Sequence, residues 1–429
     1  MRCDWMDAAQ AMRRPRATCR GQAGLARIDG LLQSKPWNST MHPVIRTSRL
    51  LIQFVFGFAA VLSTANAATP QTVVGTARID ITPELPIRLA GYGSRQTEAG
   101  RIERRLYARA LAIGTDDQRP VVLLTVESIG ISEEISGAVA AALQRSHRLD
   151  RERLAICTTH THTGPMLRGH IPFMFSQDLP PEEAARIARY TDSFRDRLVQ
   201  AAAAALADRK PGRLAWAEGK AGFATQRRKI VDGKFAGFGL FPEGLADRAL
   251  PILRVTDEQG GLRAVFVSYA CHSTTLNGTD NFVHSDWAGD AAARIEGAHG
   301  GAVALVALGC AGDANPSPRG SLEQVARHGQ EIATEVERLL GAPMRPLGPV
   351  TSAKYRQIQL PLDRAVTRKE LQQRVVKAGK RTSYAASKFI QQIDAGRPLP
   401  TTVPCPVQTW CFGDDLAMVF LGGEVVSEY

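Results

Sequence analysis

The stretch Pro120–Pro165 reads PVVLLTVESIGISEEISGAVAAALQRSHRLDRERLAICTTHTHTGP. It begins and ends with apolar runs, which are typical of strands covered on both faces. Between them, Ser132 precedes two glutamates, and Ile135, Val139 and Leu143 recur at helical spacing. A polar cap, acidic residues in the first turn and this periodicity predict a helix that begins after Ser132. The stretch therefore predicts a strand, a helix and a second strand in succession.

The same alternation of apolar runs and helical patterns continues along the chain. Further strands are expected at 73–83, 262–271, 302–310, 353–362 and 416–421. Further helices are expected at 181–208, 286–297, 321–340 and 367–395. No internal repeat or low-complexity linker interrupts the pattern. We therefore expect an α/β fold, with a mixed β-sheet core covered by helices, in one domain formed by residues 68–429.

The first 67 residues are expected to carry a targeting signal. Two arginines precede a 13-residue apolar stretch, Leu50–Leu62, and an A-x-A cleavage site follows that ends at Ala67. This order is typical of a secretory signal peptide, and the apolar stretch is shorter than a spanning helix requires. We expect residues 41–67 to be this signal peptide and residues 1–40 to be a gene-model extension. The mature chain would be exported, periplasmic or secreted, without a transmembrane segment.

The formal net charge of +11 is unevenly distributed. Residues 1–67 contribute +6, and the remaining 44 basic and 39 acidic residues contribute +5. No basic run of the kind that follows a phosphate backbone is present, so nucleic acid is not an expected partner. Five of the seven cysteines lie beyond residue 67, and no CxxC pair occurs among them. A disulfide between Cys405 and Cys411 is left open.

His160 and His162 stand at positions i and i+2 of the motif HTHTGP, directly after an apolar run. In an extended backbone this spacing places both imidazoles on one face, where they can chelate a single ion. Zinc binds imidazole and carboxylate ligands, and a catalytic zinc site commonly has three protein ligands. The alternative is a pair of ordinary surface histidines. We interpret the motif as half of a zinc site.

Polar residues follow other apolar runs in the same way. His272, the GDANP segment at 312–316 and Glu424 each come directly after such a run. Ligands of α/β proteins bind at the carboxyl ends of strands, so His272 and Glu424 are the candidates to complete a metal site there. Taken singly, His272 could be a hydrogen-bonded core histidine and Glu424 a solvated turn residue.

Other polar segments have two interpretations each. His284 could orient a metal ligand or act as a proton shuttle, and Asp286 is expected to cap the helix that it begins. The cluster Arg227–Lys229 could bind a carbonyl or an anionic group, but a solvated charged loop is the simpler interpretation. The Met- and Phe-rich segment 165–181 could be a lid over an apolar substrate or a loop buried on the core.

The order of several segments resembles that of the neutral, non-lysosomal ceramidase family. These segments are VGTARIDITP, LAGYGSR, LYARALAI, ICTTHTHTGP, YACHSTTLNGTDNFVHSDWAGD, GCAGDANP and FLGGE, and they span nearly all of 73–424. Members are zinc amidases that cleave the N-acyl bond of ceramide to give sphingosine and a fatty acid. The resemblance implies one Zn²⁺ per chain, held by His160, His162, His272 and Glu424, with a metal-activated water attacking the carbonyl.

Candidate roles follow for other residues expected around the metal. Asn315, Asp313 and His284 are the candidate catalytic residues, and Arg227 and Arg228 are the candidate substrate-binding residues. The substrate would be a lipid-like or small amide, and a lipid substrate would bring the protein into peripheral contact with a membrane.

The sequence departs from the family pattern at three places. Asn315 stands where the ceramidases have a serine in their GD-x-S-P block, and asparagine can donate a hydrogen bond to an oxyanion but cannot be a nucleophile. Ile102–Glu103 replaces an Ile-His pair, and the sequence ends at Tyr429, so we expect a domain truncated before the family's further strands and immunoglobulin-like domain. Two alternatives stay open: a zinc hydrolase of another small amide or ester, and an inactive metal-binding relative.

Overall fold

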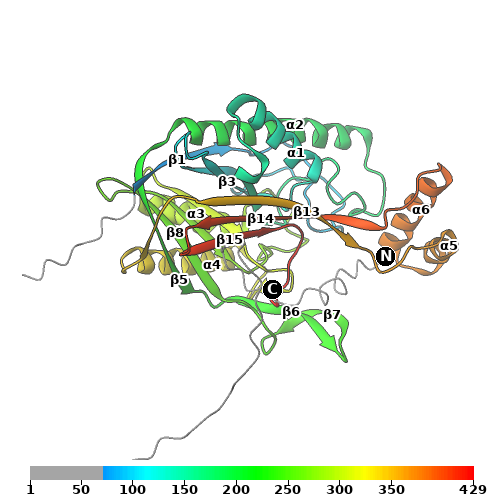
Figure 1. Cartoon of the computed structure of the whole chain (residues 1–429). Coiled ribbons are helices and arrows are strands. Elements are labelled where there is room, and N and C mark those ends of the chain that lie inside the picture. Colours follow the sequence, from blue (N-terminus) through cyan, green and yellow to red (C-terminus); the bar gives the residue numbers. More distant parts are fainter. Residues whose placement is uncertain (1–70) are drawn as a thin grey trace, which may run out of the picture. The chain divides into compact units, whose positions relative to one another are not determined.

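The computed structural model describes residues 71–429, and the predicted signal peptide and the stretch before it lie outside the described residues. Six α-helices occur in the described part (Figure 1). They are α1 Glu133–His147, α2 Pro181–Ala207, α3 Asp286–Ala298, α4 Leu322–Leu340, α5 Arg368–Lys377 and α6 Lys380–Asp394. No helix among residues 71–429 is long and apolar enough to cross a membrane.

The larger of the sheets has nine strands, in the order β10-β9-β8-β5-β1-β2-β3-β4 with β12 paired to β5. These strands are β1 Gln71–Asp80, β2 Tyr107–Ile113, β3 Val121–Val126, β4 Leu154–Thr158, β5 Lys210–Lys220, β8 Ala249–Asp257, β9 Leu262–Tyr269, β10 Val303–Leu308 and β12 Arg345–Leu347. The pairs β3–β4 and β9–β10 are parallel, and the other neighbouring strands are antiparallel. The expectation of an α/β fold with a mixed sheet is therefore confirmed.

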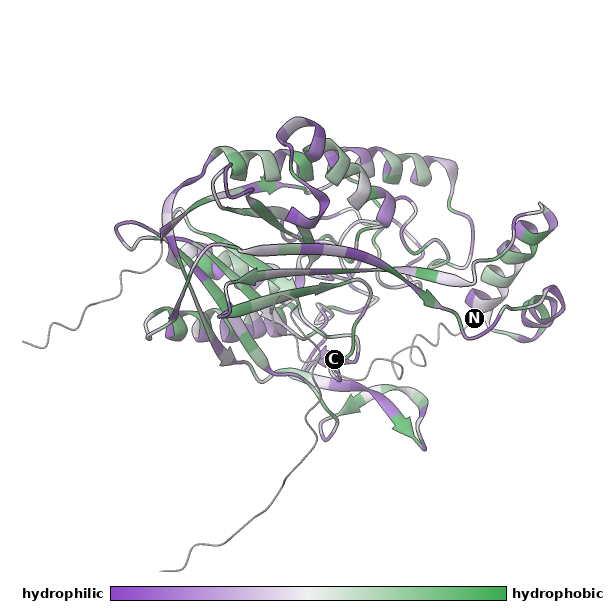
Figure 2. Cartoon of the chain, in the orientation of Figure 1, coloured by the Kyte–Doolittle hydropathy of each residue, from purple (hydrophilic) through white to green (hydrophobic). Residues whose placement is uncertain are grey.

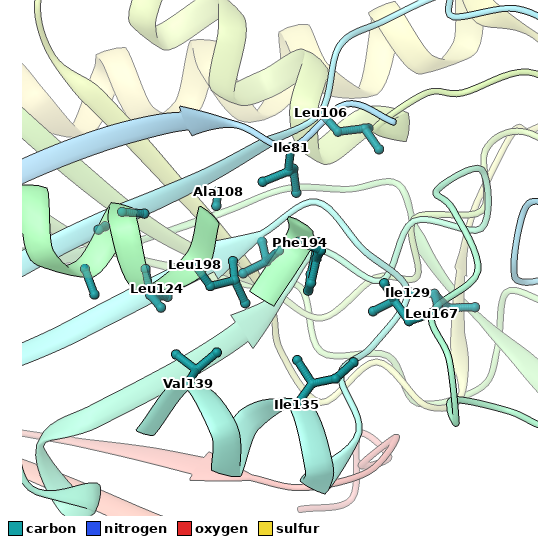
Figure 3. Packing of buried hydrophobic residues seen from close by; sticks show 14 of the residues in the cluster. Ile81, Leu106, Ala108, Leu124, Ile129, Ile135, Val139, Leu167, Phe194 and Leu198 are labelled. Atoms are coloured by element: carbon teal, nitrogen blue, oxygen red, sulfur yellow. The ribbon is translucent and has the colours of Figure 1, made fainter. Parts of the chain in front are cut away.

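Helices cover the outer faces of this sheet. Helix α1 begins as the sequence predicts, because the Ser132 hydroxyl accepts a hydrogen bond from the Ile135 N–H. It packs with α2, and Phe194 and Leu198 of α2 are buried in one core with the outward residues of β2 and β3 (Figure 3). A second core lies between α3, α4 and the outward residues of β8, β9 and β10. The two halves of the sheet thus carry separate pairs of helices.

The inner faces of the two halves meet in a third core. Leu123 of β3, Val255 of β8 and Leu305 of β10 belong to it, and β10 approaches β2, β3 and β4 although it pairs only with β9. The sheet therefore folds over on itself. This folding brings the carboxyl end of β4 close to those of β9 and β10, which lie at the opposite edge of the strand order.

Two three-stranded sheets complete the fold. One contains β13 Ser352–Pro361, β14 Thr402–Phe412 and β15 Leu416–Leu421, and the other contains β6 Ala224–Val231, β7 Lys234–Phe241 and β11 Ala314–Pro316. Trp410 and Phe412 of β14 are buried in the inner core, which fixes the first of these sheets against the large one. Glu424 follows β15, so it reaches the large sheet from a separate sheet.

Several sequence-based expectations were wrong in detail. The helix expected at 367–395 is two helices, α5 and α6, separated at Ala378 and Gly379, where the backbone is extended. Glycine has a low helix propensity, which explains the break. The cluster Arg227–Lys229 belongs to strand β6 rather than to a solvated loop. The disulfide between Cys405 and Cys411, which the sequence left open, does not form, because Cys405 has a free thiol.

Candidate metal centre

Three histidines converge on one point of the structure. The ring nitrogens that His160, His162 and His272 can offer to an ion all lie within 4.8 Å of one another. The ring centroids of His160 and His272 are 4.5 Å apart, and that of His162 lies 5.0 Å from the first and 5.7 Å from the second. His272 lies more than a hundred positions from the other two histidines in the sequence, so the folding of the large sheet is what brings it to them.

The turn that carries His160 and His162 differs from the expected extended backbone. Strand β4 ends two residues before His160, which has a positive φ of 58°. The hydroxyls of Thr161 and Thr163 then donate to the carbonyl of His284, at 2.9 and 2.8 Å. The two imidazoles therefore converge through a left-handed residue that hydrogen bonds hold in place, and not through the alternation of a strand.

The LAGYGSR segment supports this turn from the other side. Buried Arg95 donates through Nη1 to the carbonyls of Ala90 and His162, both at 2.7 Å. Gly91 has a φ of +99°, and a Cβ on it would lie 2.5 Å from the Cβ of His162. The ring of Tyr92 lies 5.1 Å from that of His162. Only glycine permits this approach, so the segment positions His162 closely.

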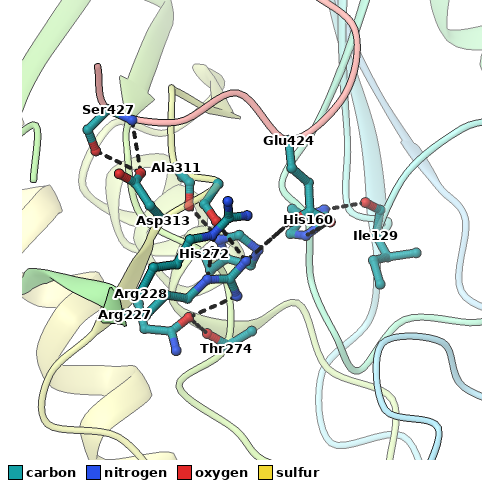
Figure 4. Close-up of polar contacts among 12 residues, drawn as sticks. Ile129, His160, Arg227, Arg228, His272, Thr274, Ala311, Asp313, Glu424 and Ser427 are labelled. Atoms are coloured by element: carbon teal, nitrogen blue, oxygen red, sulfur yellow. Dashed lines mark hydrogen bonds and ion pairs between the residues drawn. The ribbon is translucent and has the colours of Figure 1, made fainter. Parts of the chain in front are cut away.

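Hydrogen bonds fix the orientation of two of the imidazoles. The Nδ1 of His160 lies 2.5 Å from the carbonyl oxygen of Ile129, and that of His272 lies 2.7 Å from the carbonyl oxygen of Ala311 (Figure 4). A carbonyl can only accept, so each Nδ1 is protonated and each Nε2 has a free lone pair. Both Nε2 atoms, and both ring nitrogens of His162, are buried without a hydrogen-bond partner among the described residues.

The surroundings keep these imidazoles neutral. Burial, and then the positive charges of Arg227 and His160, lower the pKa of His272 to about 3. Burial, followed by the neighbouring His160 and His272, holds the pKa of His162 well below its ordinary value, and burial also lowers that of His160. Neutral imidazole is the form that binds a metal ion.

Glu424 brings a carboxylate to the histidines. Its Oε2 lies 3.3 Å from Nε2 of His272, and its Oε1 lies 3.7 Å from Nε2 of His160 (Figure 4). The Nη2 of Arg227 lies 3.2 Å from the same Oε2. Partial burial raises the pKa of Glu424, but its polar neighbours, His272 first and then His160 and the cationic Arg227, outweigh burial and hold that pKa well below its usual range. The half-exposed carboxylate is therefore ionised beside the unpartnered nitrogens.

A close backbone contact places Glu424. The N–H of Gly312 donates to the carbonyl of Val425 at 2.7 Å, and a Cβ on Gly312 would lie 2.3 Å from the carbonyl oxygen of Glu424. Asp313 reinforces this contact, because its Oδ1 accepts from the N–H and the hydroxyl of Ser427, both at 2.9 Å. The GDANP segment thus holds the chain that follows β15.

Residues 73–333 match the family described as neutral/alkaline non-lysosomal ceramidase, N-terminal. This match covers more than half of the chain. The chain belongs to that ceramidase family. A curated relative, neutral ceramidase from Drosophila pseudoobscura pseudoobscura, is 25% identical over 239 residues, which are 52% of this chain and 32% of the relative. The chain therefore spans about a third of the length of that relative.

Solved structures share the ceramidase fold. The crystal structure of neutral ceramidase from Pseudomonas aeruginosa superposes with a TM-score of 0.61 at 18% identity, covering 80% of this chain and 61% of that one. The structure of a ceramidase complexed with C2 superposes with the same TM-score and identity, and this match covers 80% of this chain and 62% of that one. The resemblance seen in the sequence is thus confirmed at the level of family and fold.

The two candidate substrate-binding arginines differ in their contacts. Arg227 donates to the carbonyl of Gly312 at 2.9 Å and lies 3.4 Å from Oδ1 of Asn315, as well as pairing with Glu424. Arg228, the next residue of β6, makes no ion pair with that carboxylate within residues 71–429, and its buried Nε has no hydrogen-bond partner there. Arg227 therefore belongs to the centre of this ceramidase-family site.

The candidate catalytic residues Asn315 and Asp313 differ in how far hydrogen bonds already occupy their side chains. The Oδ1 of Asn315 accepts from the Thr274 hydroxyl at 3.0 Å and from Arg227, which leaves its amide N–H groups as the donors. The carboxylate of Asp313 is occupied by Ser427 and, through Oδ2, by Gln226 at 2.9 Å. Asn315 is therefore the one with hydrogen-bonding capacity to offer.

His284 and Asp286 connect the metal-centre segments to helix α3. The Nδ1 of His284 accepts from the N–H of Asp286 at 2.9 Å, and burial lowers the pKa of His284 to about 3. Asp286 is the first residue of α3, with Ser285 at the N-cap position, and its carboxylate accepts from the N–H of Trp287 and from those of Thr275 and Leu276. It thereby joins α3 to the chain that follows His272.

The donors present fit a zinc ion. Three imidazoles with unpartnered nitrogens and one ionised carboxylate surround a single point, and zinc binds both ligand types. The carbonyls of Ile129 and Ala311 supply the outer hydrogen bonds that commonly orient metal-binding histidines. The sequence missed Arg95, Gly91 and the pairing of Arg227 with Glu424. For Arg95 and Gly91, the available sequence signal was the segment LAGYGSR, in which a glycine is followed by an aromatic residue.

Proposed function

We propose that this chain is a zinc-dependent hydrolase of an amide bond in a ceramide-like lipid, similar in activity to an N-acylsphingosine amidohydrolase. The observation that carries the proposal is the set of unpartnered, buried nitrogens of His160, His162 and His272 beside the carboxylate of Glu424. Four unsatisfied polar atoms at one buried point are costly unless a ligand binds them. Family membership supplies the reaction class.

Zinc held by these four residues would supply polarisation of the amide carbonyl and a lowered pKa for the attacking water. The residues of the chain itself would orient the substrate. Asn315 would donate its amide N–H to the oxygen on which negative charge develops, because Thr274 and Arg227 occupy its Oδ1 and fix the direction of its donors. The guanidinium of Arg227, next to both Asn315 and Glu424, would stabilise the same charge.

Asn315 also favours a second candidate function, the hydrolysis of a smaller amide or ester. An asparagine in place of the serine of the ceramidase GD-x-S-P block retains a hydrogen-bond donor but removes a hydroxyl from the site. A site that lost a substrate-contacting hydroxyl would discriminate among substrates differently. An inactive metal-binding relative remains the third candidate.

Metal content and substrate turnover, measured on the same preparations, test these candidates. The wild type, the double variant His160→Ala/His162→Ala and the matched control His299→Ala would be compared; His299 follows the carboxyl end of α3 and pairs with Glu337. About one zinc per chain is expected for the wild type and the control, and none for the double variant. Circular dichroism would establish that the double variant folds.

A fluorescent ceramide and a panel of simple N-acyl compounds and esters would then be offered to each preparation. Turnover of ceramide supports the first proposal, and turnover of the small compounds alone supports the second. Zinc without any turnover supports a binding role, and a wild type that contains no zinc contradicts the metalloenzyme proposal.

We further propose that residues 41–67 are a signal peptide and that residues 68–429 form one exported hydrolase domain, periplasmic or secreted. The apolar stretch and the A-x-A site support this proposal. Mass spectrometry of the protein recovered from its native cells would test it, with a mature N-terminus near Ala68 as the expected result. A mature chain that retains residues 41–67 would contradict it.

A further inference from the structure

The helical hairpin α5–α6 carries the net positive charge of the domain. It is inserted between β13 and β14, and residues 362–400 contain nine basic and three acidic residues, a net charge of +6. Residues 68–429 as a whole have a net charge of only +5, so the rest of the domain is close to neutral. The basic residues are dispersed in the sequence, which is why no basic run is visible there.

Most of these charges have no partner. Ion pairs within the described residues join Arg364 to Glu370, Arg368 to Asp394 and Lys388 to Asp178. The six basic residues without an ion pair in residues 71–429 are Lys369, Arg374, Lys377, Lys380, Arg381 and Arg397. All of them except Arg374 are exposed.

Three of these unpaired cations gather at the turn between the helices, next to an exposed apolar residue. Lys377 ends α5, Lys380 begins α6, and Arg381 follows it. Val376, beside them, has 83% of its surface exposed, more than any other large hydrophobic residue of the described chain. We name Val376, Lys377, Lys380 and Arg381 the hairpin tip. Figure 2 shows hydrophilic residues on both helices that lead to it.

The hairpin is held firmly, and it is connected to the metal centre. Thr367 and Glu370 form a capping box at the start of α5. Phe389 of α6 packs edge-on against Phe173 at a centroid distance of 5.2 Å, and the Tyr384 hydroxyl donates to Asp178 at 2.7 Å. Phe173 and Asp178 belong to the segment 165–181, which directly follows the HTHTGP motif. The hairpin is therefore fixed against the segment that leads away from the histidine motif.

We propose that the hairpin tip docks the protein on an anionic lipid bilayer. Unpaired lysines and arginines are attracted to anionic headgroups, and an exposed aliphatic side chain between them can enter the headgroup region. A nucleic-acid backbone would match the charges but would leave Val376 without a favourable contact. The inference goes beyond the proposed hydrolase activity, because binding to a bilayer requires neither zinc nor turnover.

Vesicle sedimentation with the full chain tests the proposal. The probes are vesicles of phosphatidylcholine alone and vesicles that contain phosphatidylcholine and phosphatidylglycerol, at low and high salt. The triple variant Lys377→Glu/Lys380→Glu/Arg381→Glu would be compared with a control of equal charge change, Arg145→Glu/Arg189→Glu/Arg327→Glu. The three control arginines are exposed helix residues without an ion pair among residues 71–429.

We expect the wild type to bind the anionic vesicles at low salt and to bind them more weakly at high salt. The tip variant should lose about a hundredfold in affinity, because each of its three cations contributes about fivefold near an anionic leaflet. The control should retain most of the wild-type affinity, and Val376→Ser should lower affinity at both salt concentrations. His160→Ala should bind as the wild type does, which separates this result from a failure of the hydrolase proposal.

Three results would overturn the inference. These are no binding of the wild type to anionic vesicles, an equal loss in the tip variant and its control, and tip-dependent binding to duplex DNA with no binding to vesicles.

Discussion

Replacing Gly312 by alanine should displace the chain that carries Glu424. The new Cβ would lie 2.3 Å from the carbonyl oxygen of Glu424, 2.9 Å from its carbonyl carbon and 3.0 Å from the carbonyl oxygen of Val425. All three contacts are with backbone atoms, so no side chain can rotate to relieve them. An ordinary contact needs about 1 Å more, and a shift of this size would also break the 2.7 Å hydrogen bond from Gly312 to Val425.

The expected result is a weaker zinc site in a folded protein. Losing the placement of one ligand should lower zinc affinity by about 10- to 100-fold, while the three histidines keep some binding. Overpacking should lower the free energy of unfolding by about 1–3 kcal/mol. A competition titration against a chromophoric chelator measures the first quantity, and urea unfolding of the zinc-free protein measures the second.

The matched control is Gly297→Ala. Gly297 lies inside α3, and a Cβ on it would meet nothing within 4 Å. Alanine in a helix is favoured over glycine, so this variant should gain about 0.5–1 kcal/mol and keep its zinc affinity. If Gly312→Ala behaved like this control in both measurements, the placement of Glu424 by the GDANP segment would be refuted.

Three further predictions concern the surroundings of the centre and the stability of the fold. Arg227→Met should lower kcat/KM, for the substrate that the wild type hydrolyses, by about 100-fold or more, because it removes a cation beside Asn315 and Glu424. Elemental analysis should find the zinc content unchanged, and a loss of zinc would contradict this prediction. Asp313→Ala should cost about 1–3 kcal/mol in urea unfolding, since it leaves the hydrogen-bond donors of Ser427 without their acceptor; unchanged stability would contradict it. Asp208→Asn should cost about 1–2 kcal/mol at pH 7, and the cost should vanish as the pH falls. Burial raises the pKa of Asp208, but the Thr76 N–H and the charge of Arg263 outweigh it and lower the pKa below 3.8, so the native contribution is complete above that value and is lost at lower pH; a cost that does not decrease as the pH falls below 3.8 would contradict the assignment.

The sequence predicted the parts of the fold that follow from local patterns. The apolar runs at 121–126, 262–269 and 303–308 became buried strands because buried parallel strands carry no polar face. Strand β2, with the sequence YARALAI, was missed because alternating alanines favour a helix as readily as a strand. The hairpin of β6 and β7 was also missed, although the Asp232–Gly233 turn between them is a recognisable hairpin signal.

The candidate site was predictable in its residues and less so in its geometry. Strand-end positions indicated His160, His272 and Glu424, and the fold brings them within a few ångströms of one another. The backbone of His160 was not predictable, because a positive φ at a histidine depends on tertiary hydrogen bonds to His284. Arg227 was predicted as a substrate-binding candidate, but its pairing with Glu424 was missed, because a charged strand in a small sheet resembles a solvated segment until its partners are known.

The Met- and Phe-rich segment 165–181 could be a lid over an apolar substrate or a loop buried on the core, and its contacts show where its apolar residues lie. Met166, Leu167 and Met174 are buried in the core that α1 and α2 share, so these residues anchor the segment on the core, while most of the rest of it is partly or fully exposed. Phe173 instead contacts α6, which the sequence could not indicate because the contact spans more than two hundred residues. Apolar composition alone specifies burial but not the partner.

A crystal structure of the zinc-loaded protein, with the ion located by anomalous scattering at the zinc edge, tests the central proposal most directly. The account predicts one zinc per chain, bound by Nε2 of His160, Nε2 of His272, a ring nitrogen of His162 and a carboxylate oxygen of Glu424, at about 2.0–2.2 Å. Zinc bound elsewhere, or zinc at the histidines with Glu424 turned away, would contradict it.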